Sequence, residues 1–287
     1  MTNNIRTKQL LIVGAVALLV AFLFTRDIKG LVKPKQETSG TPAAGQLTTN
    51  TAAQNINLQD VSAAGKNVIN ASLAAEITTL ENTYKSTSGA DQIKAAQLLA
   101  QKWDDVEQTI PSALYLEIVA SKEKTLNNWL NAGGRLMKAF DTTQDSVMQP
   151  ALLQKANTAY TNAMAIDSTS AEAKTGLGIT IVNGMGMPMK GIAMLLDVVK
   201  KDPKNLKAQM SLGTFAIKSG QFDKAIVRFN DIIAQKPSPD AYFYLATAYE
   251  NLGKNKEAVE AYLKSKKLAA NPTLSKFIDK RVAELSK

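Results

Sequence analysis

Cysteine and histidine are both absent from the 287 residues of this chain. Their absence excludes disulfides, thiol nucleophiles and zinc sites built on either residue, and it removes the commonest general base. Carboxylates, lysine, tyrosine, serine and threonine remain as chemical groups, and no constellation of them marks an active site. We therefore expect no enzymatic activity, no cofactor and no bound metal.

A continuous basic surface is also absent, although the chain carries a net charge of +9. Residues 1–41 contribute +4 and residues 253–287 contribute +5, so the residues between them sum to zero. Nucleic acid is bound by a basic patch or stripe, so we expect none among the partners. The lysines of the last segment are interpreted as a solvated face, with anionic lipid or an acidic partner as the alternative. Asp104, Asp105 and Glu250 are interpreted as exposed helix charges.

One long apolar run, LLIVGAVALLVAFLF, extends from Leu10 to Phe24. As a helix, residues 9–25 would reach ~25 Å, the low end of the length that spans a bilayer core. A short basic head, residues 1–8, precedes the run, and no A-x-A-like cleavage site follows it closely,. The pattern favours an uncleaved single-pass transmembrane helix (a signal-anchor) over a cleaved signal peptide or a buried core helix. Two basic residues precede the run and four follow it, a count that nominally favours a cytoplasmic carboxyl side,. Anchors with a short basic head usually keep that head inside, so we favour the orientation that places the rest of the chain outside the cytoplasm.

Residues 26–60 are the predicted flexible linker. Large apolar residues are almost absent from Pro34 to Gln59, where Thr, Gly, Ala, Asn and Gln dominate. Such a stretch cannot bury enough apolar surface to offset the entropy lost on ordering. A tether of this length has a root-mean-square span of ~25–30 Å.

Beyond Val61 the apolar period is 3.6 residues and no two-residue alternation appears, so the fold is predicted to be all-α. In residues 61–124, Gly89 and Asp91 indicate a break between helices and Pro111 indicates the start of another,. This helical region is interpreted as divergent repeats or as a cap.

The strongest pattern is a repeat with a period near 34 residues. Its two clearest blocks contain Leu212, Gly213, Gly220, Ala225, Phe229 and Pro237, then Tyr242, Leu245, Ala246, Tyr249, Gly253, Ala258 and Tyr262. Small residues let the two helices of a hairpin approach closely, and aromatic residues fill the space beside the next hairpin. A period of this length predicts stacked helical hairpins, a solenoid that offers a surface rather than a catalytic pocket.

Over residues 125–272 the chain resembles the tetratricopeptide repeat (TPR) family. A third block contains Leu177, Gly178, Leu195 and Pro203, with Gly191 where alanine is usual and one inserted residue at the turn. A degenerate block contains Trp129, Ala132, Gly133, Ala156, Tyr160 and Ala163, with a longer loop over residues 141–150. The resemblance implies a TPR-type solenoid. Residues 273–287 are predicted to form an amphipathic capping helix whose apolar face holds Leu274, Phe277, Ile278 and Leu285.

The resemblance implies that a ligand binds in a concave groove lined by the first helix of each repeat. Carried over residue by residue, the groove positions are Thr175, Ile179, Val182, Met210, Thr214, Ile217, Phe243, Thr247 and Glu250. This lining is largely apolar and lacks the Lys, Asn and Arg with which co-chaperone repeats hold a terminal carboxylate. An apolar or amphipathic protein segment is therefore the expected ligand. The alternative is that some of these residues pack on neighbouring helices.

Methionines cluster in the stretch Asn183–Met189, where thioethers could bind copper(I),. The preferred interpretation is a turn between two helices, with Pro188 at the first position of the second.

The whole layout resembles membrane-anchored bacterial TPR proteins. It implies a scaffold or adaptor for protein–protein interactions at the cell envelope, anchored in the inner (cytoplasmic) membrane with its soluble domain in the periplasm. A periplasmic chaperone-like holdase, or an accessory factor of protein export or assembly, is the alternative. Self-association through the groove or the first helical region is a further possibility.

Overall fold

The computed structural model describes residues 56–287. The predicted head, transmembrane helix and nearly all of the predicted linker fall on residues 1–55, outside the described residues. Within residues 56–287, no helix combines the length and apolar character needed to cross a bilayer.

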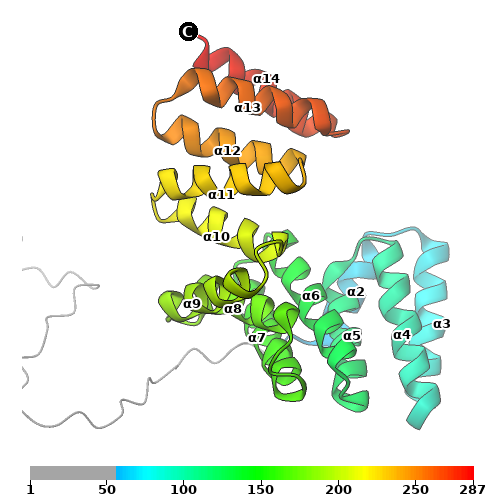
Figure 1. Ribbon diagram of the computed structural model, residues 1–287. Helices are drawn as coiled ribbons and strands as arrows, with labels where there is room; N and C mark the ends of the chain where they lie inside the picture. The colour runs from blue at the N-terminus through cyan, green and yellow to red at the C-terminus, as the bar shows by residue number, and fades with distance from the viewer. Residues whose placement is uncertain (1–55) are drawn as a thin grey trace, which may run out of the picture. The chain divides into compact units, whose positions relative to one another are not determined.

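The described residues form thirteen α-helices and no β-strand, which confirms the predicted all-α fold (Figure 1). The helices are α2 (Leu58–Asn67), α3 (Ala71–Ser86), α4 (Gly89–Asp105), α5 (Thr109–Glu123), α6 (Leu126–Thr142), α7 (Met148–Ile166), α8 (Ala171–Gly184), α9 (Pro188–Lys201), α10 (Leu206–Lys218), α11 (Phe222–Gln235), α12 (Pro239–Asn251), α13 (Asn255–Leu268) and α14 (Pro272–Leu285).

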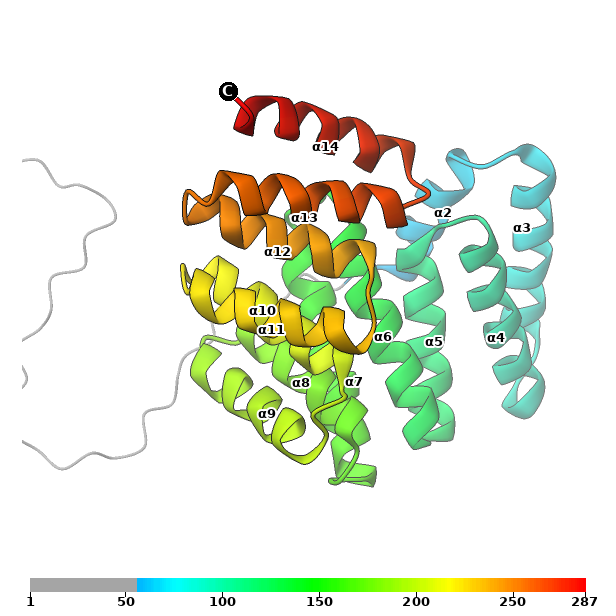
Figure 2. The same ribbon diagram turned by 45° about the horizontal axis from the view of Figure 1, so that its top comes forward.

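From α3 onward each helix packs against the next one along the chain, and Figures 1 and 2 show α8 to α14 following one another in sequence order. Alternate helices also meet, because α6 contacts α8, α8 contacts α10, and α10 contacts α12. We call these four helices the inner row. Their neighbours α7, α9, α11 and α13 complete the hairpins. This nearest-neighbour arrangement is that of a helical-hairpin solenoid.

The turns within three successive hairpins are alike. Each has a glycine with positive φ one residue after the first helix's C-cap: Gly186 (φ 71°), Gly220 (φ 73°) and Gly253 (φ 71°). This left-handed conformation favours glycine because a Cβ would be strained there. The sequence predicted that the residue inserted in the third block lies at the turn. It lies in α8 instead, because α8 has 14 residues whereas α10 and α12 have 13.

Small residues allow close helix packing at the predicted places. A Cβ placed on Gly191 of α9 would lie 2.5 Å from the carbonyl oxygen of Gly178 in α8. A Cβ on Gly213 of α10 would lie 2.7 Å from the ring of Phe229 in α11. Backbone approach this close is possible only without a side chain. The glycines of the repeat pattern therefore set the distance between the two helices within a hairpin.

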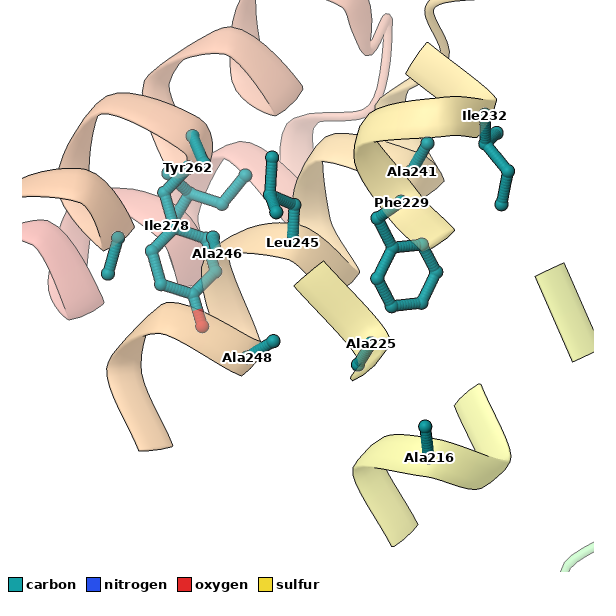
Figure 3. Close-up of a cluster of buried hydrophobic side chains, with 12 residues drawn as sticks. Ala216, Ala225, Phe229, Ile232, Ala241, Leu245, Ala246, Ala248, Tyr262 and Ile278 are labelled. Atoms are coloured by element: carbon teal, nitrogen blue, oxygen red, sulfur yellow. The ribbon is translucent and has the colours of Figure 1, made fainter. Parts of the chain in front are cut away.

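The core of the carboxyl-terminal hairpins runs through α11, α12, α13 and α14 (Figure 3). Phe229, Leu245 and Tyr262 are buried in it, and Ile278 of α14 is completely inaccessible. The predicted capping helix is thus present, and it begins at Pro272. Phe277, predicted on its apolar face, is instead 51% exposed.

Four predicted boundaries shift. The helical part begins at Leu58, inside the predicted linker, because the side chain of Asn57 accepts a hydrogen bond from the Gln59 N–H (2.8 Å) and caps α2,. Gly89 begins α4 rather than separating two helices, and α5 starts at Thr109, before Pro111. The loop predicted over residues 141–150 is confined to residues 143–147, between α6 and α7.

Candidate functional site

The nine predicted groove residues all lie on α8, α10 and α12 of the inner row, as the repeat pattern requires. On α8, Thr175 is only 1% exposed, and its hydroxyl has no hydrogen-bond partner among the described residues. Ile179 and Val182 are half-buried and pack on the cluster that includes Leu195 and Leu212. Thr175 is therefore a core residue, and only part of the surface of Ile179 and Val182 is exposed.

The predicted residues of α10 also serve the packing. Met210 and Ile217 are half-buried against the carboxyl-terminal core. The Thr214 hydroxyl donates a hydrogen bond to the carbonyl of Ser211 within the same helix (2.9 Å). Met210 and Ile217 thus contribute to core packing, and Thr214 is hydrogen-bonded within its own helix.

Helix α14 contacts the predicted surface of α12 through Phe277 and Arg281. The ring of Phe243 lies 5.6 Å from that of Tyr262 and 5.9 Å from that of Phe277, measured between centroids. The Thr247 hydroxyl donates to the Phe243 carbonyl (3.0 Å). We call Phe243 and Phe277 together the aromatic edge, because they bring a half-buried and an exposed ring into contact on one surface.

Glu250 is not a free surface charge, contrary to the prediction. It accepts hydrogen bonds from the Tyr262 hydroxyl (2.8 Å) and from Nε of Arg281 (2.9 Å), and its side chain is 17% exposed. The hydrogen bonds from Arg281 lower the pKa of the Glu250 carboxyl despite its partial burial,. Its contacts therefore fasten α14 to α12 and α13 and leave little of the carboxylate for a partner.

A cleft of about 550 Å³, which the sequence did not predict, lies among α4, α5, α6 and the start of α8. We call it the Asp104 cleft. Its polar wall consists of Gln97, Gln101, Asp104, Ser112, Asn131 and Arg135. Leu116 and Leu130 add apolar surface, and Glu172 lies at the α8 end. The volume falls within the range of ~300–1,000 Å³ that is typical of ligand sites.

An ion pair between Asp104 and Arg135 joins α4 to α6 within this cleft. The other carboxylate oxygen of Asp104, Oδ1, is buried and has no hydrogen-bond partner among residues 56–287. The same holds for the hydroxyl of Ser112, a residue that is 1% exposed. Asp104 is thus not the exposed helix charge that was predicted. Buried polar atoms without partners are costly, so two of them in one cleft call for an explanation.

The cleft has a weak signal in the sequence. Gln97, Gln101 and Asp104 follow one another at helical spacing on α4, and Asn131 and Arg135 do so on α6. Each set predicts a polar helix stripe, which is ordinarily a solvated face. Only the packing of α4 beside α5 and α6 shows that the stripes face one cleft.

The methionine stretch is the turn between α8 and α9, as preferred on sequence grounds. Pro188 is at the amino-terminal end of α9, and Met187 and Met189 are 43% and 73% exposed. In the described part of the chain, no group of three or more Asp and Glu residues is placed to hold a metal ion.

Comparison with known proteins identifies one repeat directly. Residues 239–272, which contain α12 and α13, match the family model described as tetratricopeptide repeat. This match confirms the resemblance for the last hairpin. A comparison with curated protein sequences finds no match.

Several solved structures resemble the fold. One is a crystal structure of MamA, with 21% identity, 62% of this chain and 92% of that chain covered, and a TM-score of 0.44. A MamA structure described as "41-end", from Desulfovibrio magneticus RS-1, has 17% identity, coverages of 63% and 97%, and a TM-score of 0.46. YrrB, described as a TPR protein with an unusual peptide-binding site, has 16% identity, coverages of 72% and 97%, and a TM-score of 0.43.

Proposed function

We propose that this chain, which carries a tetratricopeptide repeat at residues 239–272, is a membrane-anchored scaffold that binds protein partners at the cell envelope. The observation that supports this function most strongly is the regular stack of helical hairpins with shared turn geometry. Such a stack presents a long row of helices to a partner.

The aromatic edge, formed by Phe243 of α12 and Phe277 of α14, is the surface that we assign to the partner. Phe277 is 51% exposed and its ring contacts that of Phe243, so the pair offers apolar surface that is already held in place. Aromatic side chains are enriched where protein interfaces are most strongly desolvated. The proposed ligand is an apolar or amphipathic segment of another protein. Because most other predicted groove residues are engaged in packing, the contact is centred on this edge.

The proposed anchor is the apolar run Leu10–Phe24, with residues 26–57 as tether. Anchoring would raise the local concentration of any bound partner at the membrane without adding contacts. We propose the inner membrane of a bacterium and the periplasmic side for the folded part. The support for this placement is the short basic head before the run,.

Co-purification of partners from gently solubilised membranes tests the scaffold function. We expect the full chain to retain one or two proteins, and the variant Phe277→Ser to lose most of them. The matched control is Val227→Ser on α11, because Val227 is 60% exposed and does not belong to the aromatic edge. Equal retention by both variants would contradict the assignment to the aromatic edge. A broad set of unrelated proteins would favour the holdase alternative.

A further inference from the structure

The Asp104 cleft has the features of a built binding site, and it lies apart from the aromatic edge. It is formed by α4, α5, α6 and the start of α8, whereas the aromatic edge is formed by α12 and α14. Ser112 is almost completely buried, lines the cleft and leaves its hydroxyl unpartnered within the described structure. Oδ1 of Asp104 is likewise buried without a partner there. The fold thus leaves two polar atoms beside the cleft without hydrogen bonds, which is unusual for buried groups,.

From this arrangement we infer that the Asp104 cleft binds an extended peptide segment that carries a basic side chain. Each side-chain amide has both a donor and an acceptor, which are the groups that a peptide backbone repeats. Gln97, Gln101 and Asn131 line the cleft, and all three are exposed. They are therefore available to a ligand.

The spacing of the polar side chains suits an extended chain. Gln97 and Gln101 are four residues apart on α4, as are Asn131 and Arg135 on α6. Four residues advance ~6 Å along a helix. An extended peptide presents alternate residues on the same side every ~6.6–6.8 Å. Helices α4 and α6 thus each supply a row of hydrogen-bonding side chains. The spacing within each row is close to the spacing of alternate residues in an extended peptide.

The charge of the cleft selects a basic side chain. Asp104 and Glu172 contribute two carboxylates and Arg135 contributes one guanidinium, so the lining has an excess of negative charge on a chain whose net charge is +9. Arg135 already pairs with one oxygen of Asp104. The Asp104 side chain is 28% exposed and Glu172 is exposed, so both carboxylates can attract an ammonium or guanidinium group in the cleft,. The remaining N–H groups of Arg135 are donors for a backbone carbonyl.

Two peptide libraries test this inference on the full chain in detergent micelles. Both consist of hexapeptides with an acetylated amino terminus and an amidated carboxyl terminus. The third position is lysine in one library and glutamate in the other, and the remaining positions hold mixed residues. Methyl NMR signals of Leu116 and Leu130 report on the cleft, and those of Leu274 report on the opposite end. We expect the lysine library to shift the cleft signals with about tenfold higher affinity than the glutamate library.

Conservative variants identify the groups responsible. Asp104→Asn is expected to weaken binding of the lysine library about tenfold, and Glu172→Gln about two- to fivefold because Glu172 is exposed,. Glu257→Gln is the matched control, since it removes one carboxylate from an exposed position on α13. Equal affinity for both libraries, or shifts confined to Leu274, would overturn the inference. Either result would leave the scaffold function of the aromatic edge untouched, because partner capture through Phe277 measures that separately.

Discussion

Tyr160 of α7 fixes the distance between two neighbouring helices of the inner row. A Cβ on Gly133 of α6 would lie 2.9 Å from its ring, and one on Gly176 of α8 would lie 2.2 Å from it. The ring is almost completely buried, and this burial raises the pKa of its hydroxyl,. The ring of Tyr160 thus fills the space beside Gly133 and Gly176, which have no side chains,.

We predict that Gly176→Ala destabilises the protein by about 1–3 kcal/mol, because the buried ring has no room to move away from the new methyl group. The matched control is Gly134→Ala, where a Cβ would approach only the Tyr160 hydroxyl, at 4.0 Å. The control should be neutral or stabilising by about 0.5–1 kcal/mol, since alanine favours the helix. Urea unfolding followed by circular dichroism measures both variants. Equal midpoints for the two variants would contradict the packing described here.

Glu250 makes stability depend on pH in a defined direction. Its pKa is lowered in the folded state by Arg281, so its contribution is fully present above the usual pKa of a glutamate,. The contribution is lost as the pH falls through the lower, folded-state value. We expect Glu250→Gln to lower stability by about 1 kcal/mol at neutral pH, and the difference from the parent to shrink in acid. Unfolding midpoints measured from pH 6 downward test this, with Glu257→Gln, which removes an exposed carboxylate from α13, as the control.

At the scale of the single helix, α14 closes the end of the solenoid. Only Ile278 of this helix is fully buried, while Leu274, Val282 and Leu285 pack partly against the core. The ion pair of Arg281 with Glu250 adds a second attachment. The helix thus shields the last hairpin from solvent, as a cap of a repeat stack must.

Ile278→Ala should cost about 2–5 kcal/mol because it leaves a cavity beneath the cap. The loss should be local, since each hairpin of a solenoid depends on its neighbours. Hydrogen exchange is expected to accelerate in α12, α13 and α14 and to stay unchanged in α5. Leu263→Ala on α13, where the side chain is 47% exposed, is the control. Acceleration throughout residues 56–287 would contradict the local coupling.

Elements with a repeated pattern were predictable from the sequence. Ala258, Tyr262 and Gly253 identify the last hairpin. Ala258 is a small buried residue, Tyr262 is a buried aromatic residue, and Gly253 has the positive φ that favours glycine,. The start of α2 was not predicted, because it depends on capping by Asn57 in a stretch of linker-like composition. The role of Glu250 was missed because its partner Arg281 is distant in sequence.

The Asp104 cleft was missed for a similar reason. Its wall combines residues of four helices, and no repeat pattern aligns α4 with the hairpins that follow. Each contributing stripe is indistinguishable from a solvated helix face when taken alone.

At the scale of the whole molecule, the described part of the chain provides surfaces at two separate places. One is the aromatic edge on α12 and α14, and the other is the polar cleft among α4, α5, α6 and α8. Their chemistry differs, since one offers apolar rings and the other offers amides and carboxylates. A scaffold with two such surfaces would be able to hold two partners, or two parts of one partner, at the same time.

The proposed anchor gives a prediction for the full chain. Deletion of residues 9–25 should move the protein from the membrane pellet to the supernatant after alkaline extraction, because the apolar run Leu10–Phe24 would be lost,. Protease added to spheroplasts should digest the folded part of the full chain if it lies in the periplasm. Retention of the deleted form in the pellet would contradict the anchor.

The most direct test of the scaffold function is photo-crosslinking in intact cells from a probe at position 277, with position 227 as the control. Phe277 and Val227 are both exposed, but only Phe277 belongs to the aromatic edge. Mass spectrometry of the adducts identifies the partners. We predict one or two dominant adducts from position 277 that are absent from position 227. No adduct from position 277, or the same adducts from both positions, would contradict the account.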